Sequence, residues 1–223
     1  MTGDHSFMTR TQQHTVPFIL ASASPRRRDL LQQVALTPDR IIPTDIDESP
    51  EPGESPRHMA ERLAQAKARA AAGLLNGEKA FILASDTVVA CGRRILGKAS
   101  TEDEARRFLS LLSGRRHRVY TGLCLITPKG RERCRIVETA VIFKRLSEQE
   151  LELYLKSGEW HDKAGAYAIQ GLAARFVKSL NGSYSNVVGL PLFETVNLLE
   201  GNGYPVFDEQ KANLTQSRKE GAA

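Results

Sequence analysis

The chain of 223 residues has few aromatic side chains, 6% of the total, and only three cysteines and five histidines. Scarce aromatic residues argue against a surface that stacks the bases of single-stranded nucleic acid. The cysteines (Cys91, Cys124 and Cys134) have unrelated spacings, and the scattered histidines include no pair at a metal-ligand spacing. We therefore expect reduced thiols in a cytoplasmic protein, with neither a disulfide framework nor a zinc site.

Membrane and export signals are also lacking. No apolar run approaches the roughly 20 residues that span a bilayer. Residues 1–16 lack the apolar middle of a signal peptide, so they are interpreted as a polar tail. The net charge of +5 suits an anionic partner but is too small to indicate nucleic-acid binding. We therefore expect neither a membrane nor a nucleic acid as a partner.

Hydrophobic residues make up 41% of the chain and charged residues 26%, which is ordinary for a globular protein with a buried core. Apolar and alternating runs predict five strands, over residues 18–21, 39–43, 81–90, 118–127 and 131–145. Capping signals and helical periodicity predict five helices, over residues 25–33, 101–114, 147–158 and 190–199 and from residue 56 onward. The alternation predicts an α/β fold, and the hairpin around residues 128–130 makes the predicted sheet a mixed one.

The long helix that begins at Pro56 has a repeat of apolar residues at steps of three and four. The repeat comprises Met59, Leu63, Ala66, Ala70 and Leu74. We expect this stripe to face the core, with Lys67 lying beside it. Beyond residue 207 the sequence becomes polar, and residues 208–223 are expected to form a loose tail.

Three arginines, residues 26–28, stand in the first turn of the first predicted helix, directly after Ser24 and Pro25. A cation at the positive end of a helix dipole costs roughly 0.3–1 kcal/mol, so this cluster predicts an anion to meet it. Backbone N–H groups, hydroxyls and guanidinium groups together suit a phosphate. The segment contains no glycine and is therefore neither a Walker loop nor a dinucleotide fingerprint. The alternative is a set of solvated surface charges.

Acidic residues provide the second candidate group. Asp86 stands inside an apolar strand, where a carboxylate is costly unless it is paired, hydrogen-bonded or bound to metal, and Thr87 adds a hydroxyl. The alternative is an aspartate that caps a loop at the strand end. Asp45, Asp47 and Glu48 form an acidic loop that could equally be solvated. If the acids converge near the arginines, the site suits magnesium-assisted attack on a phosphoanhydride.

Two lysines and a glycine-rich segment complete the candidates. Lys98 follows Gly97 in a strand-exit loop and could contact phosphate, as could Lys67, although a lysine is more often a surface charge. Small residues over 162–171 allow backbone to approach a ligand closely, and the Gln170 amide could read the edge of a base. The same segment could be a simple chain reversal.

Taken together, five motifs resemble those of the Maf family of nucleoside triphosphate pyrophosphatases. They cover residues 20–27, 85–87, 97–98, 162–171 and 182–191, and the resemblance runs from about Phe18 to Leu199. The segment from Lys163 to Gly171 is most similar to the branch that acts on dTTP and UTP. A sister branch that acts on 7-methyl-GTP differs in this segment.

The resemblance implies a Maf/ITPase-like fold: a mixed, twisted sheet flanked by helices, with a cleft between two lobes. It implies a domain over residues 17–207, a homodimer, and a divalent cation, magnesium or manganese. The family's catalytic residue, a proton acceptor or metal ligand, falls on Asp86. Its specificity positions fall on Arg26, Thr87 and Gln170, and its phosphate and metal contacts on Ser24, Arg27, Glu48, Lys67 and Lys98.

This chain departs from the family pattern at two points. Many relatives have proline after the Gly-Lys pair, where this chain has Ala99, so the loop that holds Lys98 is expected to be less rigid. The acidic loop varies in length among relatives, which leaves the choice between Asp47 and Glu48 as second metal ligand open.

The resemblance implies hydrolysis of dTTP and UTP, or of modified pyrimidine nucleotides, to the monophosphate and pyrophosphate. The alternative is a non-catalytic nucleotide sensor that regulates cell division, since the family name comes from a septation phenotype. A third hypothesis, a basic nucleic-acid binder, is disfavoured by the low aromatic content and by acids interleaved along the chain.

Overall fold

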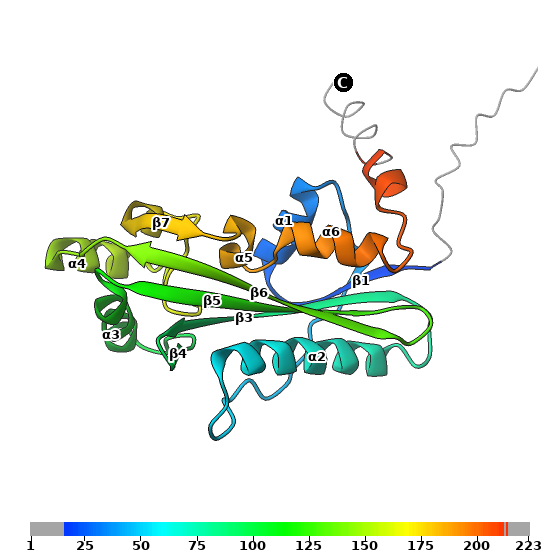
Figure 1. Cartoon of the computed structure of the whole chain (residues 1–223), viewed down its shortest axis with the longest axis horizontal. Coiled ribbons are helices and arrows are strands. Elements are labelled where there is room, and N and C mark those ends of the chain that lie inside the picture. The colour runs from blue at the N-terminus through cyan, green and yellow to red at the C-terminus, as the bar shows by residue number, and fades with distance from the viewer. Residues whose placement is uncertain (1–15, 212, 214–223) are drawn as a thin grey trace, which may run out of the picture.

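The computed structural model describes residues 16–211 and 213. In this part of the chain seven strands form one sheet in the order β2-β1-β3-β5-β6-β7, with β4 beside β3 (Figure 1). The strands are β1 (Phe18–Ala21), β2 (Arg40–Ile41), β3 (Phe81–Cys91), β4 (Arg94–Leu96), β5 (Arg116–Ile126), β6 (Glu132–Phe143) and β7 (Val177–Asn181). β1 pairs in parallel with β2 and β3, and the remaining pairs are antiparallel, so the predicted mixed sheet is confirmed.

Helices cover both faces of this sheet. They are α1 (Pro25–Gln33), α2 (Pro56–Leu74), α3 (Glu102–Leu112), α4 (Glu148–Ser157), α5 (Tyr184–Val188) and α6 (Leu192–Glu200), with a 3-10 turn, η1 (Leu172–Phe176). α2 lies along one face, and α1 and α6 lie on the opposite face of the same half (Figure 1). α3 and α4 lie at the other end of the long strands.

The two halves have separate apolar cores. One core, around Leu109, Tyr154 and Phe176, buries the inner sides of α3 and α4. At the other end, Phe18 and Leu199 belong to a core that packs β1, α1 and α6 against the sheet, while the alanine face of α2 packs on the opposite side. The long strands β3, β5 and β6 connect the halves, which gives the two lobes that the family resemblance implied.

A gap in the sheet lies between these lobes. β5 occupies one edge of β3 over residues 82–90. On the other edge, β1 pairs with residues 81–84 and β4 with residues 89–91. No described strand therefore pairs with residues 85–88 along that edge. Asp86 and Thr87 stand at this opening.

The predicted stripe of α2 is wrong in phase. Met59 and Leu63 are buried as expected, but Leu74 is 61% exposed. The buried residues are Met59, Ala60, Leu63, Ala64, Lys67, Ala68 and Ala71. Alanines occur on every side of this helix, so hydrophobicity alone does not determine its rotation. Lys67 consequently lies within the buried stripe and not beside it.

Other boundaries also differ from the predicted ones. The strand predicted over 39–43 is reduced to β2. The stretch between the helices predicted over 147–158 and 190–199, where no element was predicted, contains β7 and α5. Ser147 and Glu150 form a capping box at the start of α4, where capping signals predicted a helix. Thr101 accepts from the N–H of Glu104, but the Glu104 carboxylate accepts from Ser100, one residue further back.

The predicted tails fall largely outside the described residues, which include neither 1–15 nor 214–223. Residues 208–211, expected to belong to a loose tail, continue a helix that begins at residue 206, and the Gln210 amide donates to the Val34 carbonyl at the end of α1. Among the described residues, no helix combines the length and the apolar character needed to cross a membrane.

Candidate active site

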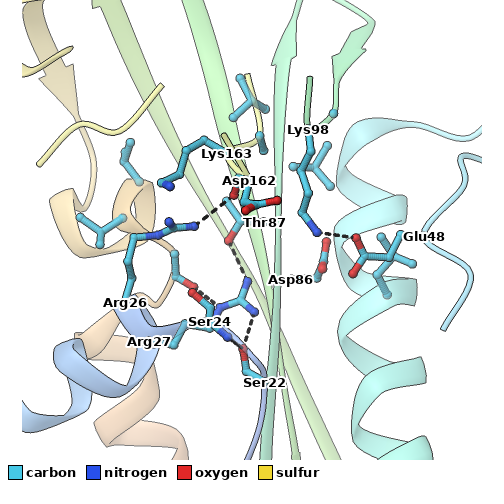
Figure 2. A pocket seen from close by; sticks show the side chains of 18 of the residues that line it. Ser22, Ser24, Arg26, Arg27, Glu48, Asp86, Thr87, Lys98, Asp162 and Lys163 are labelled. Atoms are coloured by element: carbon cyan, nitrogen blue, oxygen red, sulfur yellow. Dashed lines mark hydrogen bonds and ion pairs between the residues drawn. The ribbon is translucent and has the colours of Figure 1, made fainter. Parts of the chain in front are cut away.

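The gap beside β3 opens into a pocket of about 600 Å³, lined by residues of both lobes. The nine residues proposed from the sequence all line it: Ser24, Arg26, Arg27, Glu48, Lys67, Asp86, Thr87, Lys98 and Gln170. They come from segments more than 140 positions apart. Figure 2 shows the arginines on one side of β3 and the Lys98–Glu48 pair on the other.

The turn from β1 into α1 directs two of the three arginines to the pocket. Pro25 begins the helix after Ser24, whose side chain makes no cap hydrogen bond and lines the pocket. Successive residues of a helix point about 100° apart, so the three arginines diverge. Arg28 is exposed and pairs with Asp29 at 3.5 Å. Arg28 is thus a solvated surface charge, whereas Arg26 and Arg27 line the pocket.

Arg27 is buried and ties three segments together. Its Nε donates to the Gly189 carbonyl at 2.9 Å, and its two terminal nitrogens donate to the hydroxyls of Ser22 at 3.0 Å and Thr87 at 3.4 Å. Burial lowers the pKa of Arg27 and the negative charge of Asp86 opposes this shift, yet a guanidinium stays protonated in proteins. At least three of its five N–H donors are therefore engaged within the protein.

Arg26 lies nearer the mouth of the pocket. Its guanidinium donates to the Asp162 carbonyl at 3.5 Å, as Figure 2 shows. Burial lowers its pKa, against the negative charge of Asp162. Lys163 is close enough that burial and the charge of Arg26 lower its pKa as well. Two cations held together in this way favour an anion between them.

Buried charge dominates the α2 side of the pocket. Lys67, only 8% exposed, forms ion pairs with both Asp86 and Glu48, and Lys98 pairs with Glu48 at 3.0 Å. Burial opposes ionisation of Glu48, but the hydrogen bonds from Lys67 and Lys98 outweigh it and lower the pKa of this carboxyl to about 2. The carboxylates and ammonium groups neutralise one another in a place where an isolated charge would be costly.

Of the two acids left open by the sequence, Glu48 lines the pocket. Asp47 is exposed, and its carboxylate accepts from the backbone N–H of Ser49 at 2.8 Å. Hydrogen bonds from the side chain and the backbone of Ser49 lower its pKa. Asp47 thus shapes the acidic loop and does not line the pocket.

Asp86 and Thr87 are neighbours on β3 and therefore project to opposite faces of the sheet. Asp86 meets Lys67 of α2, whereas Thr87 meets Arg27 on the α1 side. Because the edge of β3 is open at this point, a single pocket reaches both side chains. The strand thus separates a charged wall from a hydroxyl-bearing wall.

The glycine-rich segment is held against the loop that carries Lys98. Lys98 and Ala164 form an isolated antiparallel bridge, and the Gly165 N–H donates to the Leu96 carbonyl at 2.9 Å. Gly165 has φ +71°, and a Cβ there would lie 2.8 Å from Val89 Cγ1, so glycine is required. This bridge supplies the backbone restraint expected to be missing beside Ala99. Gln170 lies exposed at the rim.

The residues fit a metal shared with a substrate better than a metal held by protein alone. In the described part of the chain, no three His, Cys, Asp or Glu side chains cluster as a metal site. Glu48 and Asp86 are the two carboxylates at the pocket, bridged by Lys67. Mg²⁺ is commonly bound through one or two carboxylates together with substrate phosphates. Glu48 and Asp86 can provide the two carboxylates.

Sequence reasoning missed several contributors. Gly189 offers its carbonyl to Arg27 and to the Ser85 hydroxyl, and the buried Thr121 and Asn186 support Thr87 from behind. A carbonyl carries no residue-type signal. The threonine and the asparagine could have been noticed as polar residues within or beside apolar segments.

Comparison with known proteins agrees with this geometry. Residues 17–202 match the family model described as "Maf-like protein", so the chain belongs to the Maf family. It is similar to proteins named dTTP/UTP pyrophosphatase. That of Mesorhizobium japonicum is 58% identical over 192 residues, covering 84% of this chain and 92% of the relative. That of Brucella abortus is 58% identical over 193 residues, covering 85% and 93%.

A solved dITP/XTP pyrophosphatase of Mycobacterium abscessus shows only a remote likeness. It is 17% identical, with a TM-score of 0.35, and the match covers 57% of this chain and 73% of that one. The fold assignment accordingly depends on the observed topology and the family match.

Proposed function

We propose that the protein hydrolyses dTTP and UTP to the nucleoside monophosphate and pyrophosphate. The observation that carries this proposal is the pocket itself, where Asp86 lies beside Lys67 and Glu48 while Arg26, Lys163 and Lys98 face the same cavity. Relatives that are 58% identical and named dTTP/UTP pyrophosphatase support the choice of substrates.

In the proposed reaction, Arg26, Lys163 and Lys98 bind the triphosphate and offset its charge. The family resemblance instead implied a phosphate contact for Arg27 and a role in specificity for Arg26. We depart from it because Arg27 is held by Ser22, Thr87 and Gly189, whereas Arg26 lies beside Lys163.

Asp86 orients a water molecule and accepts its proton as the water oxygen attacks the α-phosphorus. The bond between this phosphorus and the bridging oxygen to the β-phosphorus breaks, and pyrophosphate leaves. Lys67 stabilises the carboxylate of Asp86 until the proton arrives. A magnesium or manganese ion, held by Asp86, Glu48 and the phosphates, would neutralise phosphate charge.

A product assay tests the reaction. The protein is incubated with magnesium and dTTP, UTP, CTP or 7-methyl-GTP, and the products are separated by ion-exchange chromatography. We expect UMP or dTMP and pyrophosphate. Orthophosphate would contradict hydrolysis between the α- and β-phosphates. A preference for 7-methyl-GTP would contradict the assignment of the segment that contains Gln170 to the dTTP/UTP branch.

The same assay distinguishes the enzyme from a nucleotide sensor that regulates cell division. A sensor would bind UTP without turnover in magnesium, manganese and other divalent cations. The buried ion pair of Asp86 with Lys67 favours the enzyme, because a binding pocket for a polyanion gains nothing from a buried carboxylate.

A homodimer and a cytoplasmic location also belong to this proposal. The similarity to bacterial relatives named dTTP/UTP pyrophosphatase supports them. Sedimentation of the protein at micromolar concentration tests the homodimer. Fractionation of cells that express the protein with a C-terminal tag tests the cytoplasmic location.

A further inference from the structure

Behind the pocket, a chain of buried hydrogen bonds runs from Arg27 through Thr87 to α5. The Thr87 and Thr121 hydroxyls lie 3.1 Å apart, opposite each other on β3 and β5. The Thr121 hydroxyl, fully buried, donates to the Asn186 backbone carbonyl at 3.3 Å. Thr87 lines the pocket, whereas Thr121 and Asn186 are fully buried and do not line it.

Asn186 is firmly placed. Its side-chain amide donates to the Val119 carbonyl at 3.2 Å and to the Thr139 hydroxyl at 2.9 Å, and the residue is fully buried. The amides three and four residues further on, at Gly189 and Leu190, donate to the Ser185 carbonyl and so do not compete for that of Asn186. The Asn186 carbonyl is thus in a fixed position to accept from Thr121.

The chemistry of the two ends decides which way every proton in this chain points. A carbonyl only accepts, so the Thr121 proton is committed to Asn186, and Thr121 must accept the proton of Thr87. A guanidinium only donates, so Arg27 uses one lone pair of the Thr87 oxygen (Figure 2). The Thr87 hydroxyl is then left with one free lone pair and no free proton. Toward the pocket it is an acceptor.

We propose that Thr121 is a positioning residue for specificity, which commits the Thr87 proton inward so that the pocket accepts a hydrogen bond from the substrate base. This inference depends on the proposed function, because it concerns a pyrimidine nucleotide in this pocket. Uracil and thymine carry an N–H at ring position 3, which an acceptor can bind. Cytosine has an unprotonated acceptor nitrogen at this position. Two acceptors would then face each other with no proton between them, so the pocket disfavours CTP.

Replacing Thr121 by valine tests this directly, since valine keeps the volume and removes the acceptor. The Thr87 proton is then free to rotate into the pocket and donate to cytosine. We expect the ratio of kcat/KM for UTP to that for CTP to fall by about tenfold, mainly because CTP improves. T121S retains the hydroxyl and should restore the ratio.

T195V is the matched control. Thr195 is another fully buried threonine, and its hydroxyl bonds the Pro191 carbonyl within α6, away from the pocket. This variant should keep the wild-type ratio. If T121V does not fold by circular dichroism, T121A, which also removes the acceptor, replaces it in the assay.

A wild-type ratio in folded T121V or T121A overturns the inference, and so does an equal loss in T121S, which would show a packing effect. Absence of turnover of any pyrimidine nucleotide by the wild-type protein overturns the proposed function instead, so the two failures are distinguishable.

Discussion

The two faces of β3 at the pocket are built from different chemistry. On the α2 face, Lys67, Lys98, Asp86 and Glu48 form three ion pairs. On the α1 face, the Thr87 hydroxyl meets that of Thr121, which donates to the Asn186 carbonyl, and Arg27 serves as a donor to neutral oxygens. Adjacent residues of one strand thus begin two separate networks.

The difference matters because the two kinds of interaction respond differently to a substrate. Ion pairs depend weakly on orientation and can rearrange as charge moves during phosphoryl transfer. Hydrogen bonds between neutral groups are directional, and a buried unpaired group is costly, so they discriminate between bases that differ in one proton. Under the proposed function, the α2 face would carry out the hydrolysis and the α1 face would select the base.

The sharpest way to break this comparison is D86N. Asparagine keeps the shape of the side chain but cannot accept the proton of the attacking water, so we expect kcat to fall by about 10²- to 10⁴-fold. Pyrophosphate release measures the loss, and calorimetric titration of UTP checks that binding persists. D47N, in the exposed neighbouring acid, is the control and should retain activity. Full activity in D86N would remove Asp86 from the reaction.

A stability measurement on the same face comes next. Replacing Lys67 by methionine leaves the buried Asp86 beside Glu48 without their shared cation, and we expect a loss of about 3 kcal/mol in the free energy of unfolding. Urea denaturation measures it. R69M on the same helix removes an exposed pair with Glu132 and should cost about 0.5 kcal/mol.

The double variant K67M/D86N sharpens that result. Because the amide of asparagine carries no charge, we expect the double variant to be more stable than K67M alone. A double variant with the summed loss of both single variants would show that the two residues do not interact.

On the opposite face, R27M tests whether Arg27 acts mainly within the protein. Methionine fills the space but leaves the Ser22 and Thr87 hydroxyls and the Gly189 carbonyl without their donor. We expect a loss of about 2 kcal/mol in stability. R28M, at the exposed neighbour, should change stability little. If R27M weakened UTP binding with no loss of stability, a phosphate contact would explain Arg27 better than its hydrogen bonds to Ser22, Thr87 and Gly189.

The sequence predicted most of what lies close together along the chain. The turn from β1 into α1 was readable because Ser24, Pro25 and the arginines are contiguous. The capping box at Ser147 is equally local. The strand β7 was missed because its five residues show only a weak apolar alternation, and it forms by pairing with β6.

Features that arise from tertiary pairing were beyond the sequence. The opening at residues 85–88 exists only because β1 and β4 share an edge of β3. Lys67 was expected beside the core, since a lysine is rarely buried, and its position became clear only with two carboxylates around it. Likewise, the Arg27 contact with Gly189 joins residues 162 positions apart.

The smallest expected effect concerns acid stability on the charged face. The pKa of Glu48 is about 2 in the folded protein and 4.5 as its ordinary value, so between these two the unfolded chain binds more protons. The contribution of Glu48 is therefore complete above pH 4.5 and is lost as the pH falls toward 2. Because this side chain is more than a third exposed, solvent screening limits the contribution to about 1 kcal/mol. Urea unfolding at pH 6 and pH 3 should show wild type losing more stability than E48Q. Equal losses would mean that the two lysines do not hold the carboxylate ionised, and the contrast between the two faces would then rest on Asp86 alone.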